Sequence, residues 1–241
     1  MKINILSPHI DDAAYSLALT ISRCVNNQIP VTIINCFTVT KWAIRFVSKD
    51  VNEVSLLRKK EDSECYKTYN ASIDIINLEL TDAPLRNDYI FQSQPFQPDE
   101  LKLVEIVKKK LEKSSDAILI SPLGIGNHID HAICKQAAVQ LYRKMKVLFY
   151  EDLPYANRIS ETEIFDQIKI LEERLNVQLT HRTDGLKNCT INKEQLIRLY
   201  KTQINDEICS EIMSHMNNLS GERIWGEAHL LEEFSRPLIH D

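Results

Sequence analysis

Short apolar runs recur along the chain and alternate with longer segments whose apolar residues repeat at helical spacing. The runs are rich in Ile, Val and Leu at consecutive positions, which is typical of strands that are covered on both faces. We expect strands at residues 2–6, 31–37, 73–78, 117–120 and 147–150, and a further extended stretch at 177–181.

The segments between these runs carry apolar residues three and four positions apart, as amphipathic helices do. We expect helices at residues 15–25, 55–70, 100–114, 161–175 and 193–215, and one that follows residue 131 and runs through residue 141. The connections 38–52 and 81–98 are long and contain aromatic, polar and proline residues, and the tail after residue 221 has too little pattern for a prediction.

Strands that alternate with helices predict an α/β protein with a Rossmann-like three-layer fold and a mostly parallel sheet. The 241 residues, 44% of them hydrophobic, suffice for one sizeable core, and no Pro-, Gly- or Ser-rich linker divides the chain. We therefore expect residues 1–241 to form a single domain.

A histidine and two aspartates follow the first expected strand: His9, Asp11 and Asp12 lie in the segment Ser7–Ala13, which reads SPHIDDA. One aspartate at this place could be explained as a helix N-cap, which uses a single side-chain oxygen. The second carboxylate and the imidazole have no role in a cap, so the group indicates a functional site.

A second group of the same residue types, His128, Asp130 and His131, follows the fourth expected strand. Two of the five glycines of the chain precede it, which suggests a loop that bends sharply or approaches a ligand. Taken alone, these histidines and the aspartate could simply open and cap a helix.

The topology brings the two groups together. In a Rossmann-like strand order, strands one and four are neighbours where the order reverses, and ligands bind there at the carboxyl ends of the strands. We therefore predict that the first group, His9, Asp11 and Asp12, lies within reach of His128 and His131, although more than a hundred residues separate the two groups in the sequence.

Imidazole and carboxylate side chains in this pattern predict a metal site. Catalytic zinc commonly takes three such ligands and leaves a fourth position for water. His9, Asp12 and His131 supply this set, and the expected cofactor is Zn²⁺ or another divalent ion such as Fe²⁺.

Three further residues are candidates for catalysis. Asp11 lies beside a metal ligand but is not needed as one, so it is the candidate general base. His128 is expected to protonate a leaving amine or to stabilise an oxyanion, with Asp130 as a partner that raises its pKa.

Composition excludes other classes of protein. The net charge of -5 argues against nucleic acid as a partner. The six cysteines form no CxxC pair, which disfavours both a thiolate zinc site and a disulfide scaffold. The first residues have no secretory signal pattern, and no apolar run approaches a membrane span, so we expect a cytoplasmic protein without a transmembrane segment.

The two motifs, PHIDD at residues 8–12 and HIDH at 128–131, resemble those of the PIG-L/LmbE family of zinc-dependent deacetylases of the N-acetylglucosamine type. The similarity extends to segments at 58–61, 150–155 and 200–203. It implies the same zinc ligands, base and acid as above. It further implies that Arg58 and Asp82 face the sugar.

The sequence departs from the family pattern at three positions. Ile10 and Ala13 stand where the family often has Pro and Glu, but neither is a ligand, so the metal site should survive. Gly126 stands where some members have a tyrosine, two residues before the second motif. Tyr155 is therefore the candidate for the missing tyrosine and for a substrate contact.

These features predict a metal-dependent N-deacetylase that acts on an amino sugar, or on a metabolite or glycoconjugate that contains one. An N-deacylase for a longer acyl chain on a glycoconjugate or peptide is the close alternative. A non-haem Fe(II) oxygenase uses two histidines and one carboxylate as well, but it leaves Asp11 without a role. A carbohydrate-binding protein that keeps the metal without turnover is the weakest alternative.

The sequence leaves the identity of the substrate and the oligomeric state open, and a homo-oligomer is compatible with it. Aromatic residues in the two long connections are expected to shape the cleft without identifying what it binds. These are Trp42, Phe46, Tyr89 and Phe91.

Overall fold

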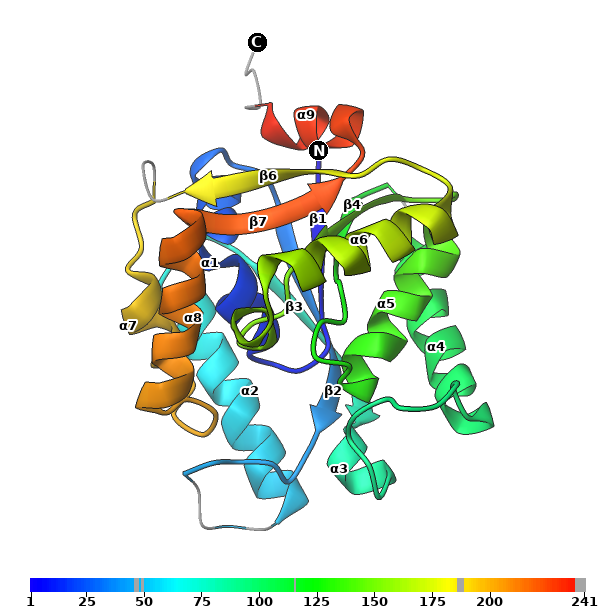
Figure 1. Ribbon diagram of the computed structural model, residues 1–241. Coiled ribbons are helices and arrows are strands. Elements are labelled where there is room, and N and C mark those ends of the chain that lie inside the picture. Colours follow the sequence, from blue (N-terminus) through cyan, green and yellow to red (C-terminus); the bar gives the residue numbers. More distant parts are fainter. Residues whose placement is uncertain (46–47, 49, 115, 186–188, 237–241) are drawn as a thin grey trace.

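The computed structural model describes residues 1–45, 48, 50–114, 116–185 and 189–236, and it shows a central sheet with helices on both sides (Figure 1). The strands are β1 (Ile3–Ser7), β2 (Val31–Val39), β3 (Asp74–Thr81), β4 (Ile118–Pro122), β5 (Lys146–Tyr150), β6 (Thr180–Gly185) and β7 (Gly221–Gly226). They form one sheet in the order β3-β2-β1-β4-β5-β7-β6. β1 to β5 are parallel, whereas β7 is antiparallel to β5 and to β6.

The α/β architecture predicted from the alternation of strands and helices is thus confirmed. The helices are α1 (Asp12–Asn26), α2 (Val51–Lys67), α3 (Ala83–Arg86), α4 (Pro98–Leu111), α5 (Ile129–Leu141), α6 (Glu161–Leu175), α7 (Lys193–Ile197), α8 (Asp206–Leu219) and α9 (Ala228–Ser235). Two short 3-10 helices, η1 (Glu112–Ser114) and η2 (Tyr155–Arg158), complete the set among the described residues.

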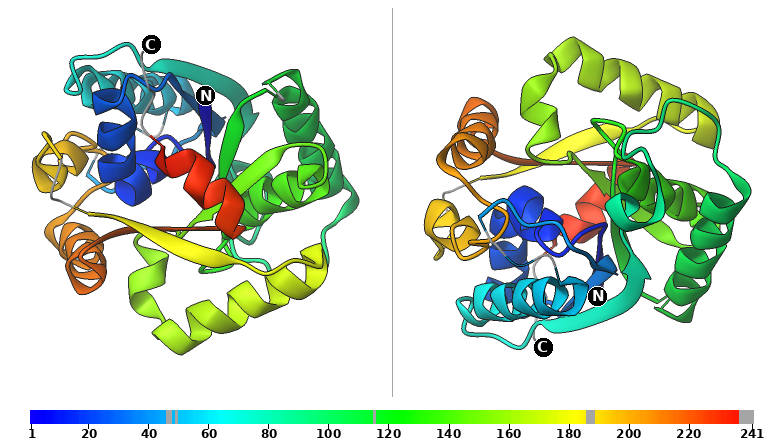
Figure 2. Two further views of the ribbon diagram at one scale, coloured as in Figure 1. Left: turned by 90° about the horizontal axis from the view of Figure 1, so that it is seen from above. Right: turned by 90° about the horizontal axis from the view of Figure 1, so that it is seen from below.

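Right-handed crossovers place the helices of the parallel part. α1 and α2 lie on one side of the sheet, and α4 and α5 lie on the other (Figures 1 and 2). Every residue of β1 and of β4 is buried, as expected for central strands covered on both faces. β1 and β4 are neighbours, so the strand order reverses between them and their carboxyl-terminal loops lie side by side.

The prediction of one long helix at residues 193–215 is wrong. The segment consists of α7 and α8, separated by a non-helical stretch. The backbone N–H of Thr202 donates to Glu61 on α2 at 3.0 Å, and the Thr202 hydroxyl donates to the same carboxylate at 2.6 Å. Asn205 then starts α8 by accepting a bond from the N–H of Ile208. A distant carboxylate therefore competes with the helical bonds that the periodicity predicted.

β7 lies in the tail, where the residue pattern supported no prediction. Its six residues, GERIWG, are all buried and include two charged ones. Glu222 pairs with Lys193 at 2.8 Å, and Arg223 pairs with Glu151. Because these charges are paired inside the protein, the strand lacks the apolar pattern that would have revealed it.

None of the helices that the structure describes is long and apolar enough to cross a membrane.

Candidate active site

In the loop between β1 and α1, neither aspartate side chain is used to cap the helix. Ser7 caps the turn, because its hydroxyl accepts a bond from the N–H of Ala13 at 3.0 Å. Asp11 occupies the N-cap position of α1, but its side chain makes no capping bond. The carboxylate of Asp12 accepts a bond from the backbone N–H of His9 at 2.7 Å. The capping explanation for Asp11 therefore does not hold.

The loop between β4 and α5 bends through two glycines with left-handed backbone angles, Gly124 at φ 73° and Gly126 at φ 85°. His128 is the N-cap of α5, and its Nδ1 accepts a bond from the N–H of Asp130 at 3.2 Å. Because Nδ1 accepts, the proton of the neutral ring lies on Nε2. His128 thus caps the helix, and this bond also fixes its tautomer.

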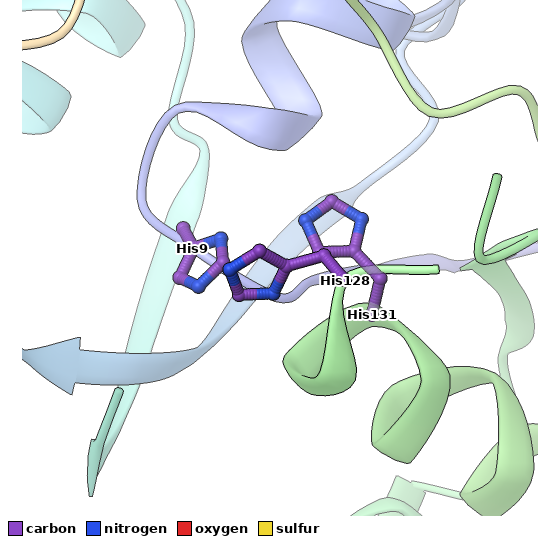
Figure 3. A group of neighbouring side chains, drawn as sticks. All are labelled: His9, His128 and His131. Carbon is purple, nitrogen blue, oxygen red and sulfur yellow. The ribbon is translucent and has the colours of Figure 1, made fainter. Parts of the chain in front are cut away.

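The two loops meet, as the topology predicted. The rings of His9, His128 and His131 gather at one point, His9 from the loop after β1 and the other two from the start of α5 (Figure 3). Their ring centres are 4.8 to 5.3 Å apart. One ring nitrogen of each lies within 4.8 Å of the others, which is close enough for a shared metal ion.

The spacing around Asp12 fits a tetrahedral metal ion. Its Oδ2 lies 3.3 Å from Nδ1 of His9 and 3.3 Å from Nε2 of His131. Two donors that are each about 2.0–2.1 Å from a tetrahedral zinc ion lie about 3.3 Å from each other. Nε2 of His131 is buried and has no hydrogen-bond partner, which is expected of a nitrogen that binds a metal ion.

A carboxylate fixes the orientation of each of these two imidazoles. Asp130 lies 3.0 Å from Nε2 of His9, and Asp152 lies 2.6 Å from Nδ1 of His131. Such contacts orient a metal-binding imidazole and leave its other nitrogen free. The sequence reasoning assigned no role to Asp152, although its place just after β5, beside the switch point, could have drawn attention to it.

The charge of Asp130 acts to raise the pKa of His128, as predicted, but the Asp130 carboxylate forms its hydrogen bonds with other residues. Besides His9, the carboxylate of Asp130 binds Arg86 at 2.7 Å and the N–H of Ala83 at 2.9 Å. The pKa of His128 is lowered to about 3, first by burial and then by the nearby His9 and His131, and the charge of Asp130 opposes this shift without reversing it. His128 is therefore a neutral side chain in this site.

The three candidate metal ligands strongly shift one another's pKa values. Burial lowers the pKa of His9, but the bonds to Asp12 and Asp130 outweigh this effect and raise it to about 9. Burial likewise opposes the charged forms of Asp12 and His131, yet their mutual attraction holds the pKa of Asp12 well below and that of His131 well above the usual range. The site therefore stabilises positive charge beside the Asp12 carboxylate, and a divalent cation at that place would be stabilised in the same way.

Asp11 has a different environment from Asp12. Arg58 on α2 donates to its Oδ1 at 2.8 Å, and the Arg58 side chain is buried. Burial raises the pKa of Asp11, and the charge of Arg58 opposes this without cancelling it. A carboxylate with a raised pKa beside a metal site is suited to accept a proton from water.

A cavity of about 340 Å³ opens on these residues, and the three predicted substrate contacts, Arg58, Asp82 and Tyr155, line it. Asp82 is only 2% exposed; its Oδ2 accepts a bond from the hydroxyl of Thr40, whereas its Oδ1 has no partner. Trp42 lines the cavity too, but Phe46 lies outside the described residues. Asp82 thus lines the cavity and keeps one buried carboxylate oxygen without a hydrogen-bond partner.

Tyr155 occupies the space beside Gly126. A Cβ atom on Gly126 would lie 2.6 Å from the Tyr155 ring, which is too close for any side chain to fit. The ring also meets that of His131 edge-on, with centres 5.5 Å apart. The glycine that departs from the family pattern is therefore required by the position of Tyr155.

Known proteins resemble this chain in sequence and in fold. The chain is 26% identical to the 2'-N-acetylparomamine deacetylase of Streptomyces fradiae over 219 residues, which covers 88% of this chain and 76% of the relative. Its fold matches a zinc-inhibited form of teicoplanin deacetylase with a TM-score of 0.68 at 17% identity, over 93% of this chain and 97% of that one. It also matches the N,N'-diacetylchitobiose deacetylase of Pyrococcus horikoshii with a TM-score of 0.55 at 14% identity, over 99% and 87% of the chains.

The family model described as PIG-L, GlcNAc-PI de-N-acetylase, matches residues 4–142. The match spans more than half of the chain and contains both histidine–aspartate motifs. The chain therefore belongs to the PIG-L family of deacetylases.

Proposed function

We propose that this chain is a metal-dependent N-deacetylase that removes the acetyl group from an amino sugar or from a metabolite or glycoconjugate that contains one. One observation carries the proposal: Asp12 lies 3.3 Å from a nitrogen of His9 and of His131, while Asp11 beside it remains outside this group. Membership of the PIG-L family supports the same activity.

In this proposal His9, Asp12 and His131 hold the metal ion. His128 is close enough to be a ligand, but its free nitrogen, Nε2, carries the proton, and a ligating nitrogen must be unprotonated. Two imidazoles and a carboxylate suit Zn²⁺, and Fe²⁺ accepts the same donors. A bound zinc ion supplies Lewis acidity, which polarises a carbonyl and lowers the pKa of water to about 7.

Asp11 is the general base in this proposal. It takes a proton from the water that attacks the acetamide carbon, and Arg58 holds it in place at 2.8 Å. The raised pKa lets the carboxyl keep this proton until the C–N bond breaks, when the proton passes to the leaving amine. The products are acetate and the protonated amine: one proton of the water reaches the amine through Asp11, and the second leaves the new carboxyl group and protonates the amine.

His128 is assigned to the developing oxyanion. His128 lines the cavity, and the depressed pKa keeps its ring neutral, so we assign its Nε2–H to donate a hydrogen bond rather than a proton. Asp130 acts through His9, which it orients, and not through His128. Its catalytic role is thus one of positioning.

Arg58, Asp82 and Tyr155 are proposed to contact the substrate from the cavity wall. The unpartnered Oδ1 of Asp82 can accept a hydrogen bond from a sugar hydroxyl. The activities named for the relatives, on N-acetylparomamine, teicoplanin and diacetylchitobiose, favour an amino-sugar substrate. We further propose that the chain works as a single domain in the cytoplasm.

Metal content and acetate release test the proposal directly. Purified protein should hold about one equivalent of divalent metal and release acetate from a panel of N-acetylated amino sugars until a chelator is added. Replacing acetyl by propionyl and hexanoyl groups on the best substrate separates a deacetylase from an enzyme for longer acyl chains. Metal-loaded protein that releases no carboxylate from any member of the panel contradicts the proposal.

A further inference from the structure

We propose that the cavity binds an apolar substituent of the substrate, an alkyl or aryl group attached to the amino sugar, against Trp42, Ile44 and Phe91. The inference rests on the proposed function, since it takes the same site as its starting point. It adds the chemical class of the group beyond the sugar.

Three exposed apolar side chains line the same cavity as His9 and His128. Trp42 is 55% exposed, Ile44 41% and Phe91 50%. Single apolar residues on a surface are common, but several around one concave site mark a surface that a ligand covers. Burial under a ligand stabilises half-exposed aromatic rings most, because each ring removes a large apolar area from water.

Phe91 is held next to the catalytic residues. The N–H of Gln92 donates to the carbonyl of Asn127 at 2.7 Å, and that of Ile129 donates to the carbonyl of Ile90 at 2.9 Å. The ring centre of Phe91 lies 6.1 Å from that of His128. The segment around Phe91 is thus fixed to the loop that carries the second motif.

The backbone of Trp42 is also fixed by hydrogen bonds. Its N–H donates to the hydroxyl of Thr40 at 2.9 Å, and its carbonyl accepts a bond from Gln203 at 2.8 Å. The same Thr40 hydroxyl donates to Asp82, so the proposed sugar contact and Trp42 belong to one unit. An indole on a fixed backbone, half open to solvent, is a preorganised platform for an apolar group.

The charges in the cavity argue against an anionic substituent. Among the described residues that line it, the two arginines already have carboxylate partners: Arg58 binds Asp11 at 2.8 Å, and Arg158 binds Glu211 at 2.9 and 2.7 Å. A phosphate or carboxylate on the substrate would have to share one of these guanidinium groups with the carboxylate that already neutralises it, whereas a neutral apolar group would not.

The methyl and hexyl β-glycosides of N-acetylglucosamine, used below micelle-forming concentrations, form a matched pair of probes. Burying two methylene groups suffices for about a tenfold gain in affinity, so we expect kcat/KM for the hexyl glycoside to exceed that for the methyl glycoside by about tenfold or more. Trp42→Ala and Phe91→Ala should each reduce this ratio towards one, and Trp42→Phe should retain most of it.

Ile170→Ala is the control, because Ile170 is 64% exposed on α6 and does not line the cavity. It should leave the ratio unchanged. Binding without turnover is measured on Asp11→Asn by tryptophan emission. The chain has two tryptophans, and Trp225 is 2% exposed, so a blue shift on adding the hexyl glycoside reports on Trp42.

The outcomes separate this inference from the proposed function. Equal kcat/KM for the two glycosides, without an emission shift, overturns the apolar subsite and leaves the deacetylase intact. A blue shift with the hexyl but not the methyl glycoside, in the absence of turnover by the wild type, supports the subsite and removes support for the deacetylase. If neither glycoside is bound or cleaved, both proposals are overturned.

Discussion

Two buried histidine–carboxylate clusters meet just after β5, where Glu151 and Asp152 follow each other in the sequence. Glu151 uses both oxygens: one lies 2.8 Å from Nε2 of His215, and the other accepts bonds from Arg223 and from the indole N–H of Trp225. Asp152 instead orients His131, whose Nε2 has no hydrogen-bond partner and lies 3.3 Å from Asp12. The same residue types thus form one cluster whose carboxylate is fully bonded and one that leaves a nitrogen free.

The difference shows how to tell a stabilising ion cluster from a candidate site. A buried imidazole nitrogen without a hydrogen-bond partner, 3.3 Å from a carboxylate oxygen, suits a metal ligand. Nη2 of Arg223 also lacks a partner, but its guanidinium is already paired with Glu151 and Glu161. Glu151 lies among permanent partners, and its contribution should be to stability. Asp152 serves His131 and should contribute to metal binding. Four predictions test this comparison, in order of their expected effect on the rate.

His131→Ala should have the largest effect, because it removes the unpaired nitrogen itself. Metal content should fall from about one equivalent to about a tenth or less, and deacetylation should be lost with it. Metal analysis of purified protein provides the measurement. His229→Ala, at an exposed position, is the control. His128→Ala should keep its metal; loss of metal there would instead favour the three histidines as the ligand set.

Asp11→Asn should retain the metal and lose about 10²–10⁴-fold in kcat, the usual contribution of a general base. Asparagine preserves the shape of the side chain but cannot hold the transferred proton. The rate of acetate release and the metal content are measured on the same sample. Asp116→Asn, at the surface, is the matched control. Turnover at the wild-type rate would remove Asp11 from the mechanism.

Asp152→Asn should weaken metal binding by about 10–100-fold, as loss of a carboxylate that orients a ligand usually does. The amide can still accept the bond from His131 but no longer strengthens its basicity. Competition with a chelator of known affinity measures the effect. An unchanged metal affinity would show that Asp152 resembles Glu151 in being purely structural.

Glu151→Gln should leave the rate of the folded enzyme unchanged and lower the free energy of unfolding by about 1.5–3 kcal/mol, since Arg223 would lose its buried charged partner but keep its ion pair with Glu161 at 2.6 Å. Urea denaturation measures the effect, and Glu232→Gln on an exposed position should change little. A loss of metal without a loss of stability would reverse the roles assigned to the two clusters.

The difference in unfolding free energy between wild type and Glu151→Gln should depend on pH, and the sign of this dependence follows from the pKa of Glu151. Burial raises the pKa of Glu151, but the bonds from His215 and Arg223 outweigh this and hold it below its ordinary value of 4.5. A carboxylate with a lowered pKa in the folded state stabilises it fully above 4.5, and this stabilisation is lost as the pH falls through the folded-state pKa. The gap between wild type and Glu151→Gln should therefore shrink below pH 4.5.

Much of the site was predictable because it depends on local pattern and chain topology. The runs that form β1 and β4 are apolar on consecutive positions, and a histidine–aspartate motif follows each within a short loop. Right-handed crossovers leave few strand orders, and the one adopted places these two strands together. The meeting of His9 and Asp12 with His131 followed from that.

The partners of these residues were not predictable. Asp130 is adjacent to His131 and two residues from His128, yet its carboxylate binds His9, 121 residues away in the sequence. The break between α7 and α8 depends on Glu61, 141 residues from Thr202. Local periodicity records which side chains are buried, and it contains no information on which distant group they meet.

The sequence by itself determined the α/β fold, the two motifs and the kinds of side chain available for a metal ion. The tertiary structure decided which nitrogen of each histidine stays free, that Asp152 orients His131, and that Trp42 and Phe91 flank the same cavity. The physical reason is range: strand and helix patterns arise from neighbours along the chain, whereas a site is formed by side chains that only packing brings together.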